Sequence, residues 1–295
     1  MNDQANKLRQ MNEMMGNSRS PILKPIPTQA RVITVTSGKG GVGKTNFTVA
    51  LAIAFARLGK KVLVIDADLG LSNVDVILGT SPPGNLLQVM QGGYSLNDVV
   101  ADGPLGIKFI SGGSGIYDLS NLSDVQLQYF LNQLGQFDSW ADVILIDTGA
   151  GLNRMVLNFV MAADEVIVIT TPEPTAVADA YAVIKTYASH GGTSPVRLVV
   201  NRVREVTEGN GVVNKLSKVT QRFLGLTLSH LGFVFEDRLV QKAVTSQVPL
   251  MIAYPDSVFA RCIDKIAHTL TFGEEIMPSP RGIRGLFQRL LAIRS

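Results

Sequence analysis

The sequence predicts an α/β protein in which a doubly wound, mostly parallel β-sheet carries helices on both faces. Two observations predict it: short runs rich in β-branched residues recur along the chain, and helical segments separate them. Strands buried on both faces are nearly continuous apolar runs, as a parallel sheet between two helical layers requires. We expect strands at residues 31–36, 61–66, 107–110, 141–147, 165–170, 196–201 and 231–235.

The first strand leads into the glycine-rich segment GKGGVGKTN, residues 38–46. Its spacing matches the G-x-G-x-x-G of dinucleotide sites and also the G-x-x-x-x-G-K-[ST] of nucleotide triphosphatases. An acid in the later segment VLVIDAD could hold a ribose in the first case. Lys44 and Thr45 favour the second, because a triphosphate needs a lysine for its β- and γ-phosphates and a hydroxyl for Mg²⁺. The apolar segment 45–59 that follows is typical of a helix packed against the sheet.

Composition limits the function classes. The chain has 295 residues, enough for one large α/β domain or two small ones. Its single cysteine, Cys262, excludes an internal disulfide and cysteine-rich metal sites, and fits a reducing cytosol. We find neither the apolar core of a signal peptide nor the ~18 apolar residues of a membrane span. The expected location is the cytoplasm, with at most a peripheral contact to a membrane.

A second lysine, Lys39, directly follows the first glycine of the loop. The segment KGGVGKT resembles the deviant Walker A motif of the MinD/ParA family of ATPases, and the resemblance extends over about residues 31–272. It implies that Lys39 reaches the phosphates of the partner subunit in an ATP-bound homodimer, so that hydrolysis needs two chains. The implied ATP-binding residues of the loop are Gly38, Gly40, Gly41, Val42, Gly43, Lys44, Thr45 and Asn46.

Aspartates stand at the ends of two later strands, in DADLGLSN (66–73) and ILIDTGAGL (144–152). The resemblance implies that Asp68 positions the attacking water and that Asp66 and Asp147 lie near Mg²⁺. One of these aspartates could instead be a strand-end cap, but three carboxylates at the edge defined by the first loop are better explained by a metal site. The implied switch residues of these loops are Asn73, Gly149 and Gly151.

Two later segments resemble the family's contacts with the nucleotide base. Asn201, in VVNRVR, matches the adenine-recognising strand end, where its amide can offer both a donor and an acceptor. An ordinary turn residue is the alternative for this position. FVFEDRLVQKA matches a later nucleotide-edge loop around Glu236, and TTPEPTAVADA resembles a loop that faces the dimer partner or an effector. The implied cofactors are ATP and Mg²⁺.

The N-terminal segment carries a further resemblance. DQANKLR, from Asp3 to Arg9, resembles the DQxxxLR segment with which the flagellar branch of the family, FlhG (also YlxH or FleN), stimulates the GTPase FlhF. Asn46, where MinD commonly has a second threonine, indicates the same branch. A frayed amphipathic tail is the alternative for this segment. The implied partner-activating residues are Asp3, Gln4, Leu8 and Arg9.

The last stretch, RGIRGLFQRLLAIRS, has one apolar helix face beside four arginines and no acid. Such a pattern predicts a helix that lies on an anionic membrane surface, with docking on its own domain as the alternative. The expected membrane-contacting residues are Ile283, Leu286, Phe287, Leu290 and Leu291.

We therefore expect an ATP-dependent, dimerising, membrane-associating ATPase that regulates flagellar number and placement and contacts FlhF and basal-body C-ring proteins. The expected domains are a partner-activating helix and proline-rich linker (1–29), the ATPase domain (30–273) and a linker with the membrane helix (274–295). A MinD-like ATPase that places the division site is one alternative, and a ParA-like DNA-partition ATPase is another. Segment 197–222 has six basic and two acidic residues, but the near-neutral core and the apolar tail argue against nucleic acid.

Overall fold

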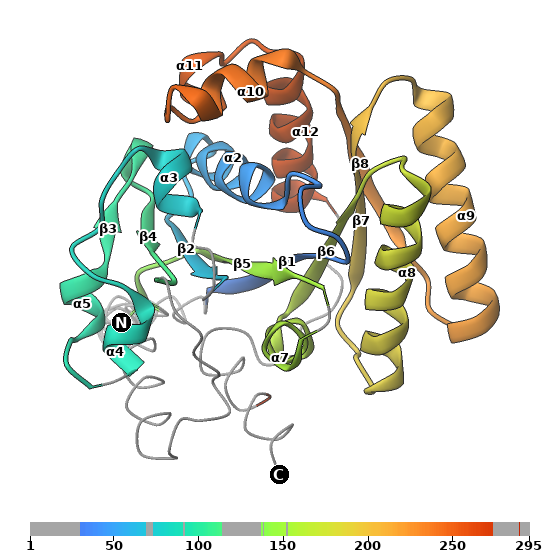
Figure 1. Ribbon diagram of the computed structural model, residues 1–295, viewed down its shortest axis with the longest axis horizontal. Helices are drawn as coiled ribbons and strands as arrows, with labels where there is room; N and C mark the ends of the chain where they lie inside the picture. Colours follow the sequence, from blue (N-terminus) through green and yellow to red (C-terminus); the bar gives the residue numbers. More distant parts are fainter. Residues whose placement is uncertain are drawn as a thin grey trace, which may run out of the picture.

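The computed structural model describes residues 30–68, 73–90, 92–113, 137, 139–151, 153–273 and 289. Within these ranges it confirms the expected fold, a sheet with the strand order β3-β4-β2-β5-β1-β6-β7-β8 (Figure 1). Every paired strand is parallel to its neighbour except β3, which is antiparallel to β4. The strands are β1 (Arg31–Ser37), β2 (Val62–Ala67), β3 (Ala101–Asp102), β4 (Lys108–Ile110), β5 (Val143–Ala150), β6 (Glu165–Thr170), β7 (Val196–Val203) and β8 (Ser229–Phe235).

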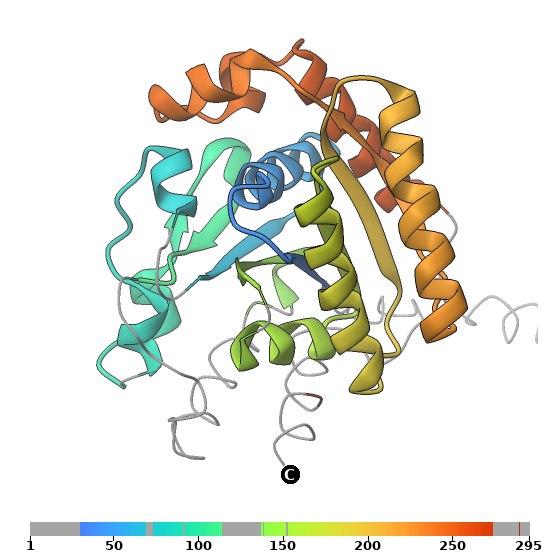
Figure 2. The same cartoon turned by 45° about the vertical axis from the view of Figure 1, so that its right-hand side comes forward.

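The strand residues alternate between two apolar layers. Val62 and Val64 of β2 pack into one layer, and Leu63 and Ile65 pack into the other. The first layer is closed by α2 (Lys44–Arg57), α3 (Val74–Leu78), α10 (Arg238–Thr245), α11 (Leu250–Ala253) and α12 (Val258–Phe272). The second is closed by α4 (Leu86–Met90), α5 (Leu96–Val99), α7 (Arg154–Ala162), α8 (Pro174–Ser189) and α9 (Val206–Leu224) (Figure 2). A short 3₁₀ turn, η1 (Pro104–Gly106), precedes β4.

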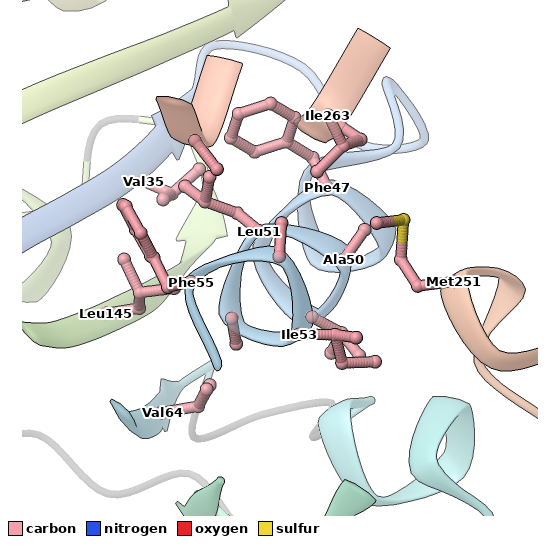
Figure 3. Packing of buried hydrophobic residues seen from close by; sticks show 14 of the residues in the cluster. Val35, Phe47, Ala50, Leu51, Ile53, Phe55, Val64, Leu145, Met251 and Ile263 are labelled. Carbon is pink, nitrogen blue, oxygen red and sulfur yellow. The ribbon is translucent and has the colours of Figure 1, made fainter. Parts of the chain in front are cut away.

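Helix α2 is the centre of the first layer and confirms the helix expected at 45–59. Phe47 and Phe55 are almost completely buried, and Figure 3 shows apolar side chains from the sheet, α11 and α12 gathered around this helix. Burying one such side chain stabilises the fold by about 1.5–3 kcal/mol. The packing therefore fixes α2, whose first turn carries the phosphate-loop lysine, against the sheet.

An ion cluster around a buried carboxylate lies at the amino ends of three strands, opposite the edge that carries the glycine-rich loop. The Glu165 carboxylate, at the start of β6, is hydrogen-bonded to the guanidinium groups of Arg31 on β1 and Arg197 on β7. A buried carboxylate is tolerated when it is paired on both oxygens in this way. The cluster joins three adjacent strands, β1, β6 and β7, at their amino ends. The candidate functional side chains lie at the carboxyl ends of the strands.

Candidate functional site

The glycine-rich loop follows β1 and ends at Gly43, immediately before α2. Gly43 has φ of 91°, in the left-handed region, and a Cβ there would lie 2.5 Å from Asn201 Nδ2. Only glycine fits a position with both constraints. No side chain caps the start of α2, so its first backbone N–H groups and the positive end of the helix dipole form a site suited to phosphate.

Three side chains of α2 converge on one carboxylate, that of Asp147 on β5. Lys44 Nζ lies 2.9 Å from Oδ1, Thr45 Oγ1 donates to Oδ2 at 2.7 Å, and Thr48 Oγ1 donates to Oδ1 at 2.9 Å. The side chains of Lys44 and Asp147 are only 8% and 1% exposed. Burying either charge alone would be costly, and the pairing offsets that cost. Thr48 was missed by the sequence analysis, although its place one helical turn after Lys44 on a buried helix was a usable signal.

Asp66 lies directly opposite Asp147 in the register of β2 and β5. It is fully buried, and its carboxylate accepts hydrogen bonds from the backbone N–H groups of Asp68 at 3.0 Å, Asn73 at 2.9 Å and Val74 at 3.1 Å. These bonds tie together the two described ends of the loop after β2. The structure thus brings Asp66 to the expected edge, where its oxygens bind the backbone of Asp68, Asn73 and Val74, while its expected contact with Mg²⁺ stays a prediction.

The carboxyl end of β5 lies against the residue that follows β2. A Cβ on Gly149 of β5 would be 3.5 Å from Asp68 Oδ1, so the Asp68 side chain sits beside the carboxyl end of this strand. Gly151 has φ of 90°, and its N–H donates to the Ser37 carbonyl at 2.9 Å, at the entrance of the phosphate loop. Asp68, Gly149 and Gly151 are therefore gathered around the phosphate loop.

Lys39 is half-exposed and makes its contacts within its own chain. Its Nζ donates to Glu173 Oε2 at 2.9 Å and to Thr175 Oγ1 at 3.0 Å, at the start of α8. The hydrogen bond and the positive charge of Lys39, helped by the charge of Arg202, hold the pKa of the exposed Glu173 carboxyl below its usual range. Both acceptors lie in segment 170–180, whose resemblance to a loop facing a dimer partner or an effector did not single out Glu173 or Thr175.

Asn201 is hydrogen-bonded to the backbone of the phosphate loop. Its Nδ2 donates to the Val42 carbonyl at 2.7 Å, its Oδ1 accepts from the Arg202 N–H at 2.9 Å, and the residue is 5% exposed. The described contacts of its amide are thus made to backbone groups. Its expected contact with adenine stays a prediction, and the structure adds a role in positioning the loop.

A polar pocket of about 290 Å³ opens beside this asparagine, at the carboxyl ends of β6, β7 and β8. The Thr171 hydroxyl is buried with no hydrogen-bond partner among the described residues, and Arg202 has φ of 56°. An unpaired buried hydroxyl and a strained non-glycine residue are typical of a binding site. Glu236, expected near the nucleotide, lies here and pairs with Arg204 Nε at 3.1 Å. The lining residues are Thr171, Pro172, Glu173, Arg202, Arg204, Glu208 and Glu236.

The terminal predictions concern residues outside the described ranges: Asp3, Gln4, Leu8, Arg9, Ile283, Leu286, Phe287, Leu290 and Leu291. Arg289 is the described residue of the C-terminal segment. Its Nε donates to the Ala162 carbonyl at the end of α7, and its Nη2 donates to Asp164 Oδ1, both at 2.7 Å. The Asp164 side chain is largely buried, and its second oxygen accepts from the Val32 N–H. This guanidinium therefore contacts the α/β domain.

The described residues contain no group of three or more His, Cys, Asp or Glu side chains placed to hold a metal ion by themselves. Nor does any helix among them have the length and apolar character needed to cross a membrane.

Comparison with known proteins places this site in context. Residues 33–250 match the CobQ/CobB/MinD/ParA nucleotide binding domain. The chain is 39% identical over 255 residues to the antiactivator FleN of Pseudomonas aeruginosa, covering 86% of this chain and 90% of that protein. It is 33% identical over 296 residues to the flagellum site-determining protein YlxH of Helicobacter pylori, covering 99% of both. A chain of the MinC:MinD cell division protein complex of Aquifex aeolicus superposes with a TM-score of 0.68 at 26% identity, covering 86% of this chain and all of that one.

Proposed function

The chain belongs to the MinD/ParA family of nucleotide-binding ATPases, in its FlhG (YlxH/FleN) branch, and from this premise we propose that it is an ATP-driven switch that regulates flagellar number and placement. The observation that carries the ATPase part is the convergence of Lys44 and Thr45 on the buried Asp147 carboxylate beside the phosphate loop. The flagellar part rests on the similarity to an antiactivator, FleN, and to a flagellum site-determining protein, YlxH.

The donor set fits Mg²⁺ bound together with a nucleotide. The Thr45 hydroxyl and the Asp147 carboxylate lie 2.7 Å apart at the carboxyl end of β5, and both are the oxygen ligands that Mg²⁺ prefers. Because Mg²⁺ is usually held by one or two protein oxygens plus phosphates and water, a site of this kind needs no larger protein cluster. Thr45 and Asp147 would hold the ion, with Asp66 nearby, and the ion would neutralise charge on the β- and γ-phosphate oxygens.

The chain's own residues supply the remaining chemistry. Lys44 and the N–H groups at the start of α2 bind and orient the phosphates. The Asp68 carboxylate, beside the carboxyl end of β5, orients the attacking water. Lys39 leaves Glu173 and Thr175 to reach the phosphates of a second subunit, and its exposed position supports such a movement. Hydrolysis is thereby restricted to the dimer.

The polar pocket next to Asn201 is the proposed place of the base and ribose. Its unpaired Thr171 hydroxyl and the side chains of Glu236 and Arg204 supply the donors and acceptors that such groups need. Asn201 joins the pocket to the phosphate loop through the Val42 carbonyl. ATP would then contact both parts of the site at once.

The proposed chain organisation is a partner-activating segment at 1–29, the ATPase domain at 30–273 and a membrane-binding segment at 274–295. The pairing of Arg289 with Asp164 supports a resting state in which the C-terminal segment contacts the domain. Dimerisation would present two such segments to an anionic membrane surface, and two weak contacts bind far more strongly than one. Hydrolysis would then return the protein to the cytoplasm.

The N-terminal segment is the proposed activator of an FlhF-type GTPase, and C-ring proteins are further proposed partners. This part rests on the resemblance of Asp3 to Arg9 alone. Replacing Asp3 or Leu8 by alanine should leave the ATPase rate unchanged and abolish stimulation of the GTPase. Unchanged stimulation would remove this role from the segment.

Deletion of the gene tests the cellular role. We expect an altered number or position of flagella with normal cell division, counted by electron microscopy. Minicells with normal flagella would contradict the flagellar role and favour division-site placement.

A further inference from the structure

An apolar groove lies between α8 and α9, helices that run side by side near the β8 end of the sheet (Figure 1, Figure 2). Its volume is about 220 Å³. Val177 and Tyr181 form its α8 side, and Leu216, Val219 and Phe223 form its α9 side. The groove is separate from the polar pocket and shares no lining residue with it.

The spacing of these residues makes a continuous strip. Val177 and Tyr181 are one turn apart on α8, while Leu216, Val219 and Phe223 are separated by three and four residues on α9, so each set lies on one helix face. Phe223 is 65% exposed, a high value for an aromatic side chain. Val177 and Leu216 belong to the buried core and Tyr181 and Val219 are partly exposed, so the exposed apolar surface of the groove is concentrated at Phe223. Aromatic residues exposed beside an apolar groove are the usual anchors of binding surfaces.

The α9 border of the groove is positively charged. Lys215 lines it, and Lys218 and Arg222 are exposed on the same half of α9. The Arg222 guanidinium lies 5.4 Å from the centre of the Phe223 ring. The chain has no acidic residue between Gly209 and Phe235, so nothing on α9 beyond its first turn or on β8 neutralises these three charges. A ligand for this groove needs an apolar face and negative flanks.

We propose that the groove binds an amphipathic helix of a partner protein, with apolar side chains facing Tyr181 and Phe223 and acidic side chains facing the basic border. A helix in a groove between two helices is a common mode of peptide recognition, with anchors at i, i+3, i+4 and i+7. Acidic residues on both sides of the partner's apolar face would speed its association with the basic border, and repulsion by that border would disfavour basic helices.

The basic border disfavours the other possible occupants of the groove. Residues 281–295 of the chain have four arginines and no acid, so the C-terminal segment would place like charges together. A second copy joined symmetrically through the groove would oppose Lys218 and Arg222 to themselves. Residues 1–16 have two acidic and two basic side chains and offer no charge match.

Binding of two designed peptides to the full chain tests the proposal. Both probes are amphipathic helices with the same leucine face, one flanked by glutamates and one by lysines, and binding is measured by fluorescence anisotropy at low and high salt. We expect the acidic peptide to bind at least about tenfold more tightly than the basic one, with an advantage that shrinks at high salt. Equal binding of the two peptides would overturn the proposal.

Matched substitutions locate the binding. Phe223→Ser and Lys218→Glu should each weaken the acidic peptide about tenfold. Their controls are Phe272→Ser, which removes a phenylalanine that is 64% exposed at the end of α12, and Lys265→Glu, which reverses an exposed charge on the same helix. All four positions are exposed, so folding should be retained, as thermal unfolding can verify. Loss of binding in the controls but not at the groove would place the peptide elsewhere.

A photo-crosslinker at position 223, used in cells, distinguishes the occupants. We expect cross-links to an acidic amphipathic segment of another protein, mapped by mass spectrometry. Cross-links within residues 1–29 or 274–295, or to a second copy of the chain, would overturn the proposal and assign the groove to that occupant.

Discussion

Lys39 Nζ lies 2.9 Å from Glu173 Oε2, within one chain and across 134 residues of sequence. In the proposed mechanism this lysine reaches the phosphates of a second subunit, which would require its release from the start of α8. Both side chains are exposed, and exposed ion pairs contribute little to stability. The contact can therefore position Lys39 in the single chain without preventing its movement to a second subunit.

Glu173→Gln should promote ATP-dependent dimerisation, because it removes the charge that holds Lys39. We expect a gain of a few-fold at neutral pH, measured by light scattering at several protein concentrations. Because the folded-state pKa of Glu173 is depressed, the ion pair persists above the usual pKa of the carboxyl and is lost only as the pH falls through the lowered value. The difference from the wild type should therefore vanish in acid. Glu205→Gln, an exposed change before α9, is the control.

Lys44→Ala should lower ATP affinity by about 10- to 100-fold, the loss expected for one charge-assisted contact of roughly 1.5–3 kcal/mol. The buried Asp147 would keep the hydroxyls of Thr45 and Thr48 as partners, so the fold should survive with reduced thermal stability. Titration with a fluorescent ATP analogue measures the affinity. Lys61→Ala, an exposed change before β2, is the control, and an unchanged affinity in Lys44→Ala would contradict the assigned role.

Asp68→Ala should leave ATP binding intact and lower the hydrolysis rate by about 100-fold or more, because it removes the group that orients water. The ATP-bound dimer should then persist in size-exclusion chromatography. Asp102→Ala, which removes an exposed carboxylate from the edge strand β3, is the control. Normal hydrolysis in Asp68→Ala would mean that another residue positions the water.

Asp164→Asn should increase binding of the ADP-bound protein to anionic vesicles several-fold, because it weakens the hold on Arg289 and leaves the C-terminal segment unchanged. The asparagine carbonyl can still accept the Val32 N–H, so little loss of stability is expected. Vesicle sedimentation measures the effect. Asp142→Asn is a matched control, because this exposed aspartate also accepts a backbone N–H, that of Lys61. Equal sedimentation of the variant and the wild type would contradict a resting contact.

Strong local patterns predicted much of the fold from the sequence. The expected strands and α2 appear because buried strands and an apolar helix carry long, unambiguous signals. The two-residue strand β3 was missed because a run that short has no periodicity. At the site, the spacing of the loop predicted Lys44 and Thr45, and the strand ends predicted where Asp66 and Asp147 would lie.

Contacts between distant segments were harder to predict. The pairing of Lys39 with Glu173 depends on how close α8 comes to the phosphate loop: a Cβ on Gly38 would lie 2.2 Å from the Asp179 backbone. The sequence contains no sign of that approach. The side-chain amide of Asn201 can bind either the edge of a base or a backbone carbonyl, and the sequence does not distinguish the two. The fold shows that the Val42 carbonyl lies within hydrogen-bonding distance.

Mixing two inactive variants tests the claim that two chains share each site. Lys39→Ala and Asp68→Ala should each be inactive alone. In a mixed dimer, the Lys39→Ala chain keeps its own Asp68 and receives Lys39 from its partner, so one of the two sites is complete. With random pairing, an equal mixture should recover about a quarter of the wild-type ATPase rate. A mixture no more active than the separate variants would show that Lys39 does not act across the dimer.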